Sequence, residues 1–120
     1  NNNAGTVPDT YMANIVTTND NEKCEKALTG LYNVIDPEIG LNVVDLGLIY
    51  RIDFVDDAGR IDLIMTLTTQ FCPMGEAITG GVMNSVTDAF PGWDVNVQLT
   101  FDPPWSFERI SPDGKQFLGH

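Results

Sequence analysis

Residues 61–74 read Ile-Asp-Leu-Ile-Met-Thr-Leu-Thr-Thr-Gln-Phe-Cys-Pro-Met, and this stretch decides the fold. Apolar side chains at positions 61, 63, 65 and 67 alternate with a more polar set, which is typical of a strand with one buried face. Two threonines, a single thiol at Cys72 and Pro73 then follow, and proline is favoured in the first turn of a helix. The stretch predicts a strand that leads through a loop into a helix, with Cys72 at or next to the helix N-cap.

A cysteine at a helix N-cap has altered acid–base chemistry. The free N–H groups and the positive end of the helix dipole favour an anion there. The thiol of Cys72 should therefore lose its proton more easily than an ordinary cysteine, whose pKa is about 8.5. This pattern indicates a functional thiol. The alternative interpretation is a buried, inert cysteine that only caps the helix. The local sequence alone favours neither interpretation over the other.

The rest of the chain supplies neighbours for this strand. Alternation over residues 50–54 (Tyr-Arg-Ile-Asp-Phe) and 95–101 predicts two more strands, and Asp-Asp-Ala-Gly at 56–59 predicts a hairpin between the first and the second. The apolar pattern over residues 73–90 predicts a helix. The path from the second strand through this helix to the third predicts a βαβ unit with parallel strands.

Another helix is predicted over residues 21–34, with Asn19 or Asp20 as its N-cap. Its apolar stripe includes Cys24, which is interpreted as a core residue without chemistry. The chain ahead of the helix is polar and rich in asparagine, so residues 1–17 are predicted to form a flexible N-terminal extension.

Residues 18–120 are predicted to form a single domain of the α/β (α+β) class, with a small three-stranded sheet packed by two main helices. The prolines at 103–104 cannot continue a central strand, so an extended Pro-Pro-Trp C-terminal tail is predicted. Trp105 and Phe107 are large aromatic residues, and both are expected to be buried.

The charge balance excludes one class of partner. The chain has 6 Lys and Arg residues against 17 Asp and Glu residues, a formal net charge of −11. Such a chain repels phosphate backbones, which argues against nucleic-acid binding. No apolar run approaches the roughly 20 residues of a membrane span, and no secretory leader is visible. A cytoplasmic protein without a membrane partner is therefore expected.

The chain offers few metal ligands. Its cysteines are Cys24 and Cys72, and its one histidine is His120. A histidine-based metal site is nearly excluded, and one chain cannot supply four thiolates for an iron–sulfur cluster. Any cluster must be held by mixed ligands or shared between chains, and two Cys72 residues across a homodimer are one hypothesis for such sharing.

Two carboxylates lie in an Asp-Pro-Glu loop after the first helix, at Asp36 and Glu38. Asp-Pro is a common start of a turn, so Asp36 is interpreted equally as a functional residue and as a structural one. Asp45, before Leu46-Gly47, is interpreted as a turn or cap residue. Trp105 is interpreted as a packing residue that fixes the tail, with a place in a partner-binding surface as the alternative.

Four motifs occur in a fixed order and spacing. They are Asp-Pro-Glu-Ile-Gly at 36–40, Asn-Val-Val-Asp-Leu-Gly-Leu-Ile-Tyr at 42–50, Thr-Leu-Thr-Thr-Gln-Phe-Cys-Pro-Met at 66–74 and Phe-Asp-Pro-Pro-Trp at 101–105. In this arrangement the chain resembles the SufT/PaaD-like family of iron–sulfur cluster assembly domains, which is related to the eukaryotic cytosolic iron–sulfur targeting domain. The resemblance covers residues 23–119.

The resemblance implies the same small α/β fold and a role in maturing or repairing iron–sulfur proteins. It implies that Cys72 is the key functional residue. The matching acidic residues are Asp36 and Glu38, and the matching hydroxyl residues are Thr68 and Thr69. These four residues are therefore expected to support the thiol.

The chain departs from the family pattern at two places. Phe101 stands where tryptophan is frequent, which keeps an aromatic packing residue. Gln70-Phe71 stands where Pro-Gly is frequent, which makes the loop bulkier and puts the access to Cys72 in doubt.

These observations predict a non-enzymatic factor for assembly, carriage or targeting of iron–sulfur clusters. A thiolate is a soft ligand that suits iron, and a single one beside hydroxyls and carboxylates makes an incomplete, releasable site. No firm cofactor is expected, only transient iron or an iron–sulfur cluster, and the expected partners are iron–sulfur assembly proteins and client apo-proteins. The alternatives are a factor for one metalloenzyme, such as a phenylacetate-degradation oxygenase, a thiol enzyme using Cys72, and a pure protein-interaction module.

Overall fold

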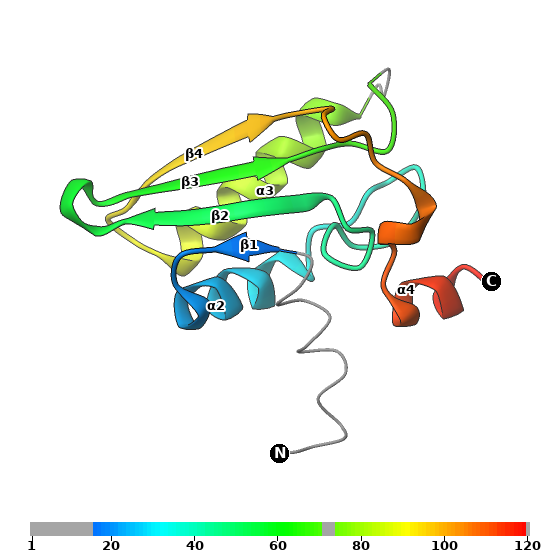
Figure 1. The fold of residues 1–120 in the computed structure, drawn as a ribbon, viewed down its shortest axis with the longest axis horizontal. Coiled ribbons are helices and arrows are strands. Elements are labelled where there is room, and N and C mark those ends of the chain that lie inside the picture. Colours follow the sequence, from blue (N-terminus) through cyan, green and yellow to red (C-terminus); the bar gives the residue numbers. More distant parts are fainter. Residues whose placement is uncertain (1–15, 71–73, 120) are drawn as a thin grey trace, which may run out of the picture.

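The computed structural model describes residues 16–70 and 74–119. Within them the chain forms a mixed α/β fold with a four-stranded sheet in the order β1-β2-β3-β4 and three α-helices. Two of the helices, α2 and α3, cover one face of the sheet (Figure 1). The strands are β1 (Thr17–Thr18), β2 (Ile49–Val55), β3 (Arg60–Met65) and β4 (Asp94–Leu99), and the helices are α2 (Asn21–Leu31), α3 (Gly75–Ala89) and α4 (Pro112–Phe117).

The sheet has one strand more than the three predicted. The additional strand is β1, which pairs in parallel with β2 through Thr17 and Arg51. Two residues are too few to show alternation, so the sequence pattern missed it. Val16 is only 4% exposed, so the folded part includes two positions that were assigned to the N-terminal extension. Residues 1–15 lie outside the described part, and their flexibility stays a prediction.

The predicted hairpin and βαβ unit are both confirmed. β2 and β3 are antiparallel, and they are joined by a 3₁₀ turn, η2 (Asp56–Ala58), and by Gly59 at a φ of 62°. β3 and β4 are parallel, and α3 connects them. The connection follows from the parallel pairing, because a hairpin turn cannot join parallel strands.

A β-bulge changes the predicted apolar face of β2. The register shifts between Ile49 and Arg51, and Ile49 is 1% exposed. Ile49 therefore takes the inward position that the alternation assigned to Tyr50. Tyr50 is half-buried, and its hydroxyl donates to the carbonyl of Pro103 at 2.9 Å.

Helix α2 begins at Asn21 with Asp20 as its N-cap, as predicted, and it ends at Leu31, three residues before the predicted end. The Asp20 carboxylate accepts a hydrogen bond from the N–H of Lys23 at 3.1 Å and caps the helix. Asn19 instead pairs with the backbone N–H and C=O of Phe54. Cys24 is 4% exposed, and burial raises the pKa of its thiol, so its assignment to the core is confirmed.

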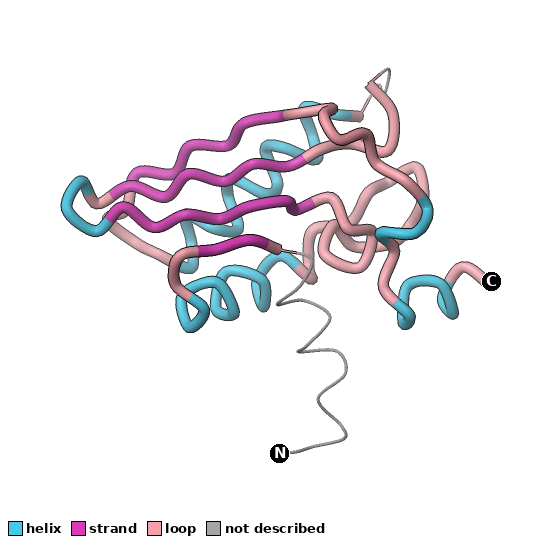
Figure 2. The backbone as a smooth tube through the Cα atoms, viewed as in Figure 1, coloured by secondary structure: helices cyan, strands magenta, loops and turns pink. Residues whose placement is uncertain are grey.

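The C-terminal segment includes residues 100–106, which form no helix or strand, and the extended Pro-Pro-Trp tail expected there stays a prediction. Past residue 106 it forms the 3₁₀ turn η3 (Phe107–Arg109) and then α4, and Figure 2 shows it beside the loops at one end of the sheet. The Ser111 hydroxyl caps α4 by accepting from the N–H of Gly114 at 2.9 Å. Trp105 packs against the core, but Phe107 is 44% exposed, so the expectation that Phe107 is buried was wrong.

Candidate functional site

The connection from β3 to α3 carries the candidate thiol, and packing fixes both of its ends. Thr66 is 0% exposed, and its N–H donates to the carbonyl of Leu48 at 2.8 Å. Leu67 is also buried, and a Cβ atom on Gly75 would lie 3.0 Å from its Cδ1. Leu67 and Gly75, on either side of the connection, therefore lie close together.

Cys72 lies, with Phe71 and Pro73, outside the described residues. The start of helix α3, however, differs from the predicted one. Helix α3 begins at Gly75, and Met74 is its N-cap, so the N-cap lies two residues after Cys72 and not at or next to it. The helix dipole favours an anion less at that separation in sequence, because its effect fades within the first turn. The role of Cys72 stays a prediction that rests on the sequence.

Asp36 is a carboxylate that is almost completely buried, with 1% exposure. Its Oδ1 accepts from the N–H of Glu38 at 2.9 Å, and its backbone carbonyl accepts from the N–H of Gly40 at 2.7 Å. The Asp-Pro sequence thus forms a tight turn, as one of the two interpretations of Asp36 required.

The turn uses only one carboxylate oxygen of Asp36. The second oxygen, Oδ2, is buried and has no hydrogen-bond partner in the part of the chain that the structure describes. Burying an acceptor without a hydrogen-bond partner destabilises the folded state. A residue that served only the turn would not require this second oxygen. The turn explains Oδ1, while Oδ2 is left for a donor or a cation.

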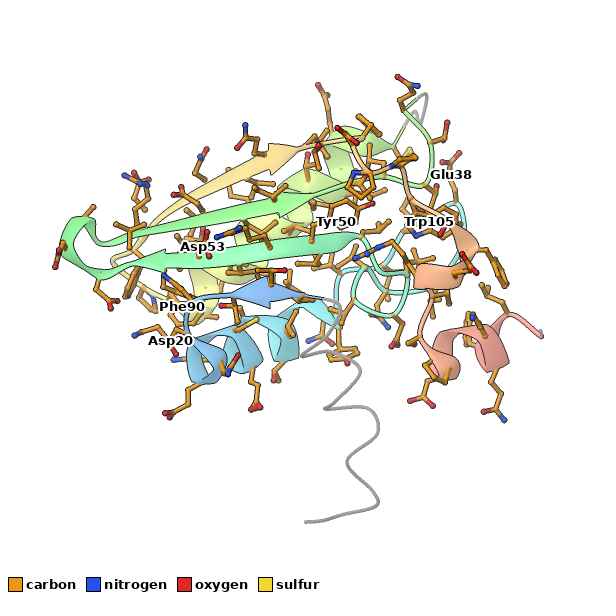
Figure 3. The ribbon with its side chains drawn as sticks, viewed as in Figure 1. Asp20, Glu38, Tyr50, Asp53, Phe90 and Trp105 are labelled. Carbon is orange, nitrogen blue, oxygen red and sulfur yellow. The ribbon has the colours of Figure 1, made fainter. Side chains whose placement is uncertain are left out.

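The other predicted supporting residues are more exposed than Asp36. Figure 3 places Glu38 at the same end of the molecule's long axis as the connection from β3 to α3, and its side chain is exposed. Thr68 is half-buried and Thr69 is exposed. Within residues 16–70 and 74–119, no group of three or more His, Cys, Asp or Glu side chains could hold a metal ion. The supporting roles of these residues remain predictions.

A second arrangement at this end joins residues 45–47 to the C-terminal segment. The Asp45 carboxylate accepts from Asn42 Nδ2 and from Ser111 Oγ, each at 2.7 Å. The N–H of Asp45 donates to Asn42 Oδ1 at 2.8 Å, which confirms the interpretation of Asp45 as a turn residue. The backbone carbonyl of Asp45 also accepts from the N–H of Ser111 at 2.8 Å.

The next two carbonyls bind the same segment. The carbonyl of Leu46 accepts from Trp105 Nε1 at 2.6 Å, and the carbonyl of Gly47 accepts from Arg109 Nε at 2.8 Å. Arg109 also lies over the ring of Tyr50, 4.2 Å from its centre, in a cation–π contact. We call the contacts of residues 45–47 with Trp105, Arg109 and Ser111 the C-terminal junction.

Sequence reasoning assigned Trp105 to fixing the tail, and its hydrogen bond confirms that role. The same reasoning missed Arg109 and Ser111. A signal for Ser111 was present, because a serine directly before a proline is a typical N-cap and first position of a helix. No helix in the described ranges has both the length and the apolar character that crossing a membrane requires.

Comparison with known proteins identifies the family. The model of the iron–sulfur cluster assembly protein family matches residues 25–99. The Fe–S protein maturation auxiliary factor YitW of Bacillus subtilis is 35% identical over 95 residues, which are 79% of this chain and 92% of the relative. The Fe–S protein maturation auxiliary factor SufT of Staphylococcus aureus is 40% identical over 86 residues, which are 72% of this chain and 97% of the relative.

A solved structure has the same fold. The crystal structure of a DUF59 domain of unknown function from Bacillus anthracis matches with a TM-score of 0.75 and 34% identity, covering 82% of this chain and 92% of that one. The family inferred from the four sequence motifs is thus confirmed by sequence and by structure. The chain belongs to the iron–sulfur cluster assembly protein family, as a SufT-like relative of the Fe–S protein maturation factors.

Proposed function

We propose that this chain acts as a non-enzymatic auxiliary factor in the maturation of iron–sulfur proteins and that Cys72 is its functional thiol. The observation that carries the proposal is the buried Oδ2 of Asp36, which has no hydrogen-bond partner among the described residues. It lies in the Asp-Pro-Glu motif, which the structure folds into a turn. Family membership supports the cargo, and the unused oxygen supports a site that is completed only when the cargo binds.

The ligand chemistry favours release over storage. A thiolate at Cys72 would be a soft ligand for iron, and Asp36, Glu38, Thr68 and Thr69 would add harder oxygen groups around it. Such a set is short of the four thiolates of a permanent cluster site. Iron or a cluster is therefore transient cargo, delivered to client apo-proteins and received from other assembly proteins. We expect this exchange in the reducing cytoplasm, where Cys72 stays a thiol.

Sharing of a cluster by two Cys72 residues across a homodimer is a second arrangement of the same site. The shortage of ligands within one chain motivates it. It predicts one cluster for every two chains, whereas a mixed-ligand site predicts up to one iron centre for each chain.

Anaerobic reconstitution with ferrous iron and sulfide tests the proposal. Wild type, Cys72→Ser and Cys24→Ala would be compared by iron content and absorption, and Cys24→Ala is the matched control because it removes the other thiol. We expect iron to be lost in Cys72→Ser and kept in Cys24→Ala. Equal iron in all three proteins would remove Cys72 from the site.

A client assay separates a carrier from an adaptor. If neither wild type nor Cys72→Ser binds iron but the variant fails to mature a client apo-protein, Cys72 acts through recruitment of another carrier. If Cys72→Ser matures the client as fast as wild type, the functional thiol is refuted, and a pure interaction module takes its place.

A further inference from the structure

Strand β4 lies at the margin of the sheet, and no strand in the described ranges pairs with its outer edge (Figure 1). The N–H of Asp94 donates to the carbonyl of Gly59 at 2.8 Å, and the N–H of Thr100 donates to the carbonyl of Met65 at 2.9 Å. Even-numbered residues therefore direct their backbone groups towards β3, and the odd-numbered residues from 95 to 99 direct theirs outwards. An exposed edge of this kind is a template for pairing with another chain.

Apolar side chains line the helix-covered side of this edge. Val95 and Val97 are half-buried, and Leu99 is 43% exposed. On α3, Met83 is 39% exposed. It lies about 200° around the helix from Gly81, whose Cβ position faces Val34 in the chain that follows α2.

Met83 is thus on the side of α3 that faces away from α2. Figure 1 shows α2 beneath the β1 side of the sheet, and β4 forms the opposite margin. We call Val95, Val97 and Leu99 the apolar lip of the edge. A strand added to β4 would cover this lip and would satisfy the outward backbone groups at the same time.

We propose that β4 of a second copy of this chain pairs antiparallel with this edge, with Val97 on the two-fold axis. In this register Val95 lies opposite Leu99 of the second copy, so apolar side chains meet on the helix-covered face. On the other face Asn96 lies opposite Gln98, and Asp94 lies opposite Thr100, so no like charges face each other.

Other registers fit less well. A shift by one residue would set outward backbone groups of one copy against inward groups of the other. A shift by two residues in one direction would set Asp94 opposite Asp102 of the second copy, and like charges directly opposite each other are destabilising. A shift by two in the other direction would set Leu99 opposite Trp93, which lies outside β4.

The pairing keeps the two proposed thiol sites apart. The connection that carries Cys72 leaves β3 after Met65, which pairs with Leu99 at the end of β4. Antiparallel pairing directs these ends of the two copies away from each other. Each copy would then present its own connection at an opposite end of one continuous sheet, so the inference does not rest on the proposed function and can fail without it.

Disulfide trapping tests the register directly. In a Cys72→Ser background, Val97→Cys places two thiols opposite each other with Cα atoms about 5.5 Å apart, which suits a disulfide. Val95→Cys is the matched control, because in this register its two Cα atoms are roughly 13 Å apart along the strands. With oxidised glutathione as the oxidant, we expect a species of twice 13.2 kDa for Val97→Cys only. Equal trapping of both variants, or of neither, would overturn the proposal.

Sedimentation equilibrium tests the dimer without a covalent bond. We expect Leu99→Lys to raise the dimer dissociation constant at least about tenfold, because it places a charge in the apolar lip. Phe117→Lys adds the same charge at a side chain that is 65% exposed on α4, and it should match wild type. A wild-type chain that stays monomeric at every protein concentration would overturn the proposal.

Salt gives a third readout, because each chain carries a net charge of −11 and two copies repel each other. We expect the dissociation constant to fall about tenfold between low salt and 0.3 M NaCl, as the Debye length shortens. A basic peptide or protein on the same edge would instead be weakened by salt. A dissociation constant that rises with salt would therefore contradict pairing between copies.

Discussion

The indole of Trp105 donates to the backbone carbonyl of Leu46 at 2.6 Å, across 59 residues of sequence. The carbonyls of Asp45 and Gly47, on either side, accept from Ser111 and Arg109. The three consecutive backbone carbonyls of residues 45–47 thus accept hydrogen bonds from one segment that is distant in sequence. This relationship explains why the Asp-Leu-Gly motif and the Pro-Pro-Trp motif occur together in the chain.

Trp105→Phe should lower the free energy of unfolding by about 1–2 kcal/mol. The variant keeps an aromatic ring but leaves the Leu46 carbonyl without its donor. Urea unfolding followed by circular dichroism would measure the loss. Phe117→Leu, at a side chain that is 65% exposed, should stay within about 0.5 kcal/mol of wild type. Equal stability of Trp105→Phe and wild type would mean that the hydrogen bond contributes nothing net.

Gly47→Ala should be more harmful than Gly40→Ala. Both glycines have positive φ, 75° at Gly47 and 85° at Gly40, so both variants carry backbone strain of about 1 kcal/mol. Only at Gly47 would the new Cβ collide with the backbone carbonyl of Arg109, whereas nothing lies within 4 Å of a Cβ at Gly40. We expect an additional loss of about 1–3 kcal/mol at Gly47, measured by the same urea titration. Similar losses at the two sites would show that the C-terminal junction yields to the methyl group.

Asp36→Asn should change stability and function in opposite directions. The amide oxygen can still accept from the N–H of Glu38, while the buried charge disappears. We therefore expect a free energy of unfolding equal to or above that of wild type, by up to about 2 kcal/mol. If the carboxylate supports the cargo, reconstituted iron and client maturation should fall. A variant that is destabilised and fully functional would assign Asp36 to the turn alone.

Cys24 should make stability fall at high pH. Burial raises the pKa of this thiol above its ordinary value of about 8.5, so the folded chain holds the proton when the unfolded chain has lost it. The contribution of Cys24 is fully present below about pH 8.5 and is lost as the pH rises from there through the folded pKa. Urea unfolding at several pH values between 8 and 11 would show a shallower decline for Cys24→Ala than for a Cys72→Ser reference that keeps Cys24. Parallel declines would mean that the thiol titrates alike in both states.

The sequence predicted the elements that have strong periodicity. The hairpin, the βαβ unit, the burial of Cys24 and the cap at Asp20 follow from local rules, because each depends on neighbours within a few residues. The family motifs carried the functional assignment, which composition alone would not have given.

The failures have physical causes as well. Strand β1 has two residues, and the bulge beside Ile49 shifts the alternation by one position, so neither produces a period that can be read. Arg109 and Phe107 depend on where the C-terminal segment folds back, and that is decided by carbonyls some 60 residues earlier in the chain. The expectation that Cys72 lies at or next to the N-cap of α3 was wrong, because the helix begins at Gly75 and its N-cap is Met74.

The C-terminal junction shows that the region matched by the family model and the set of residues that contact one another in the fold end at different positions. The family match ends at residue 99, but the segment that covers the carbonyls of residues 45–47 runs on to Ser111. A fragment trimmed to the matched region would retain the Asp-Leu-Gly motif and lose the three donors to its backbone carbonyls. The contacts that complete the fold therefore extend twelve residues beyond the region that the family model matches.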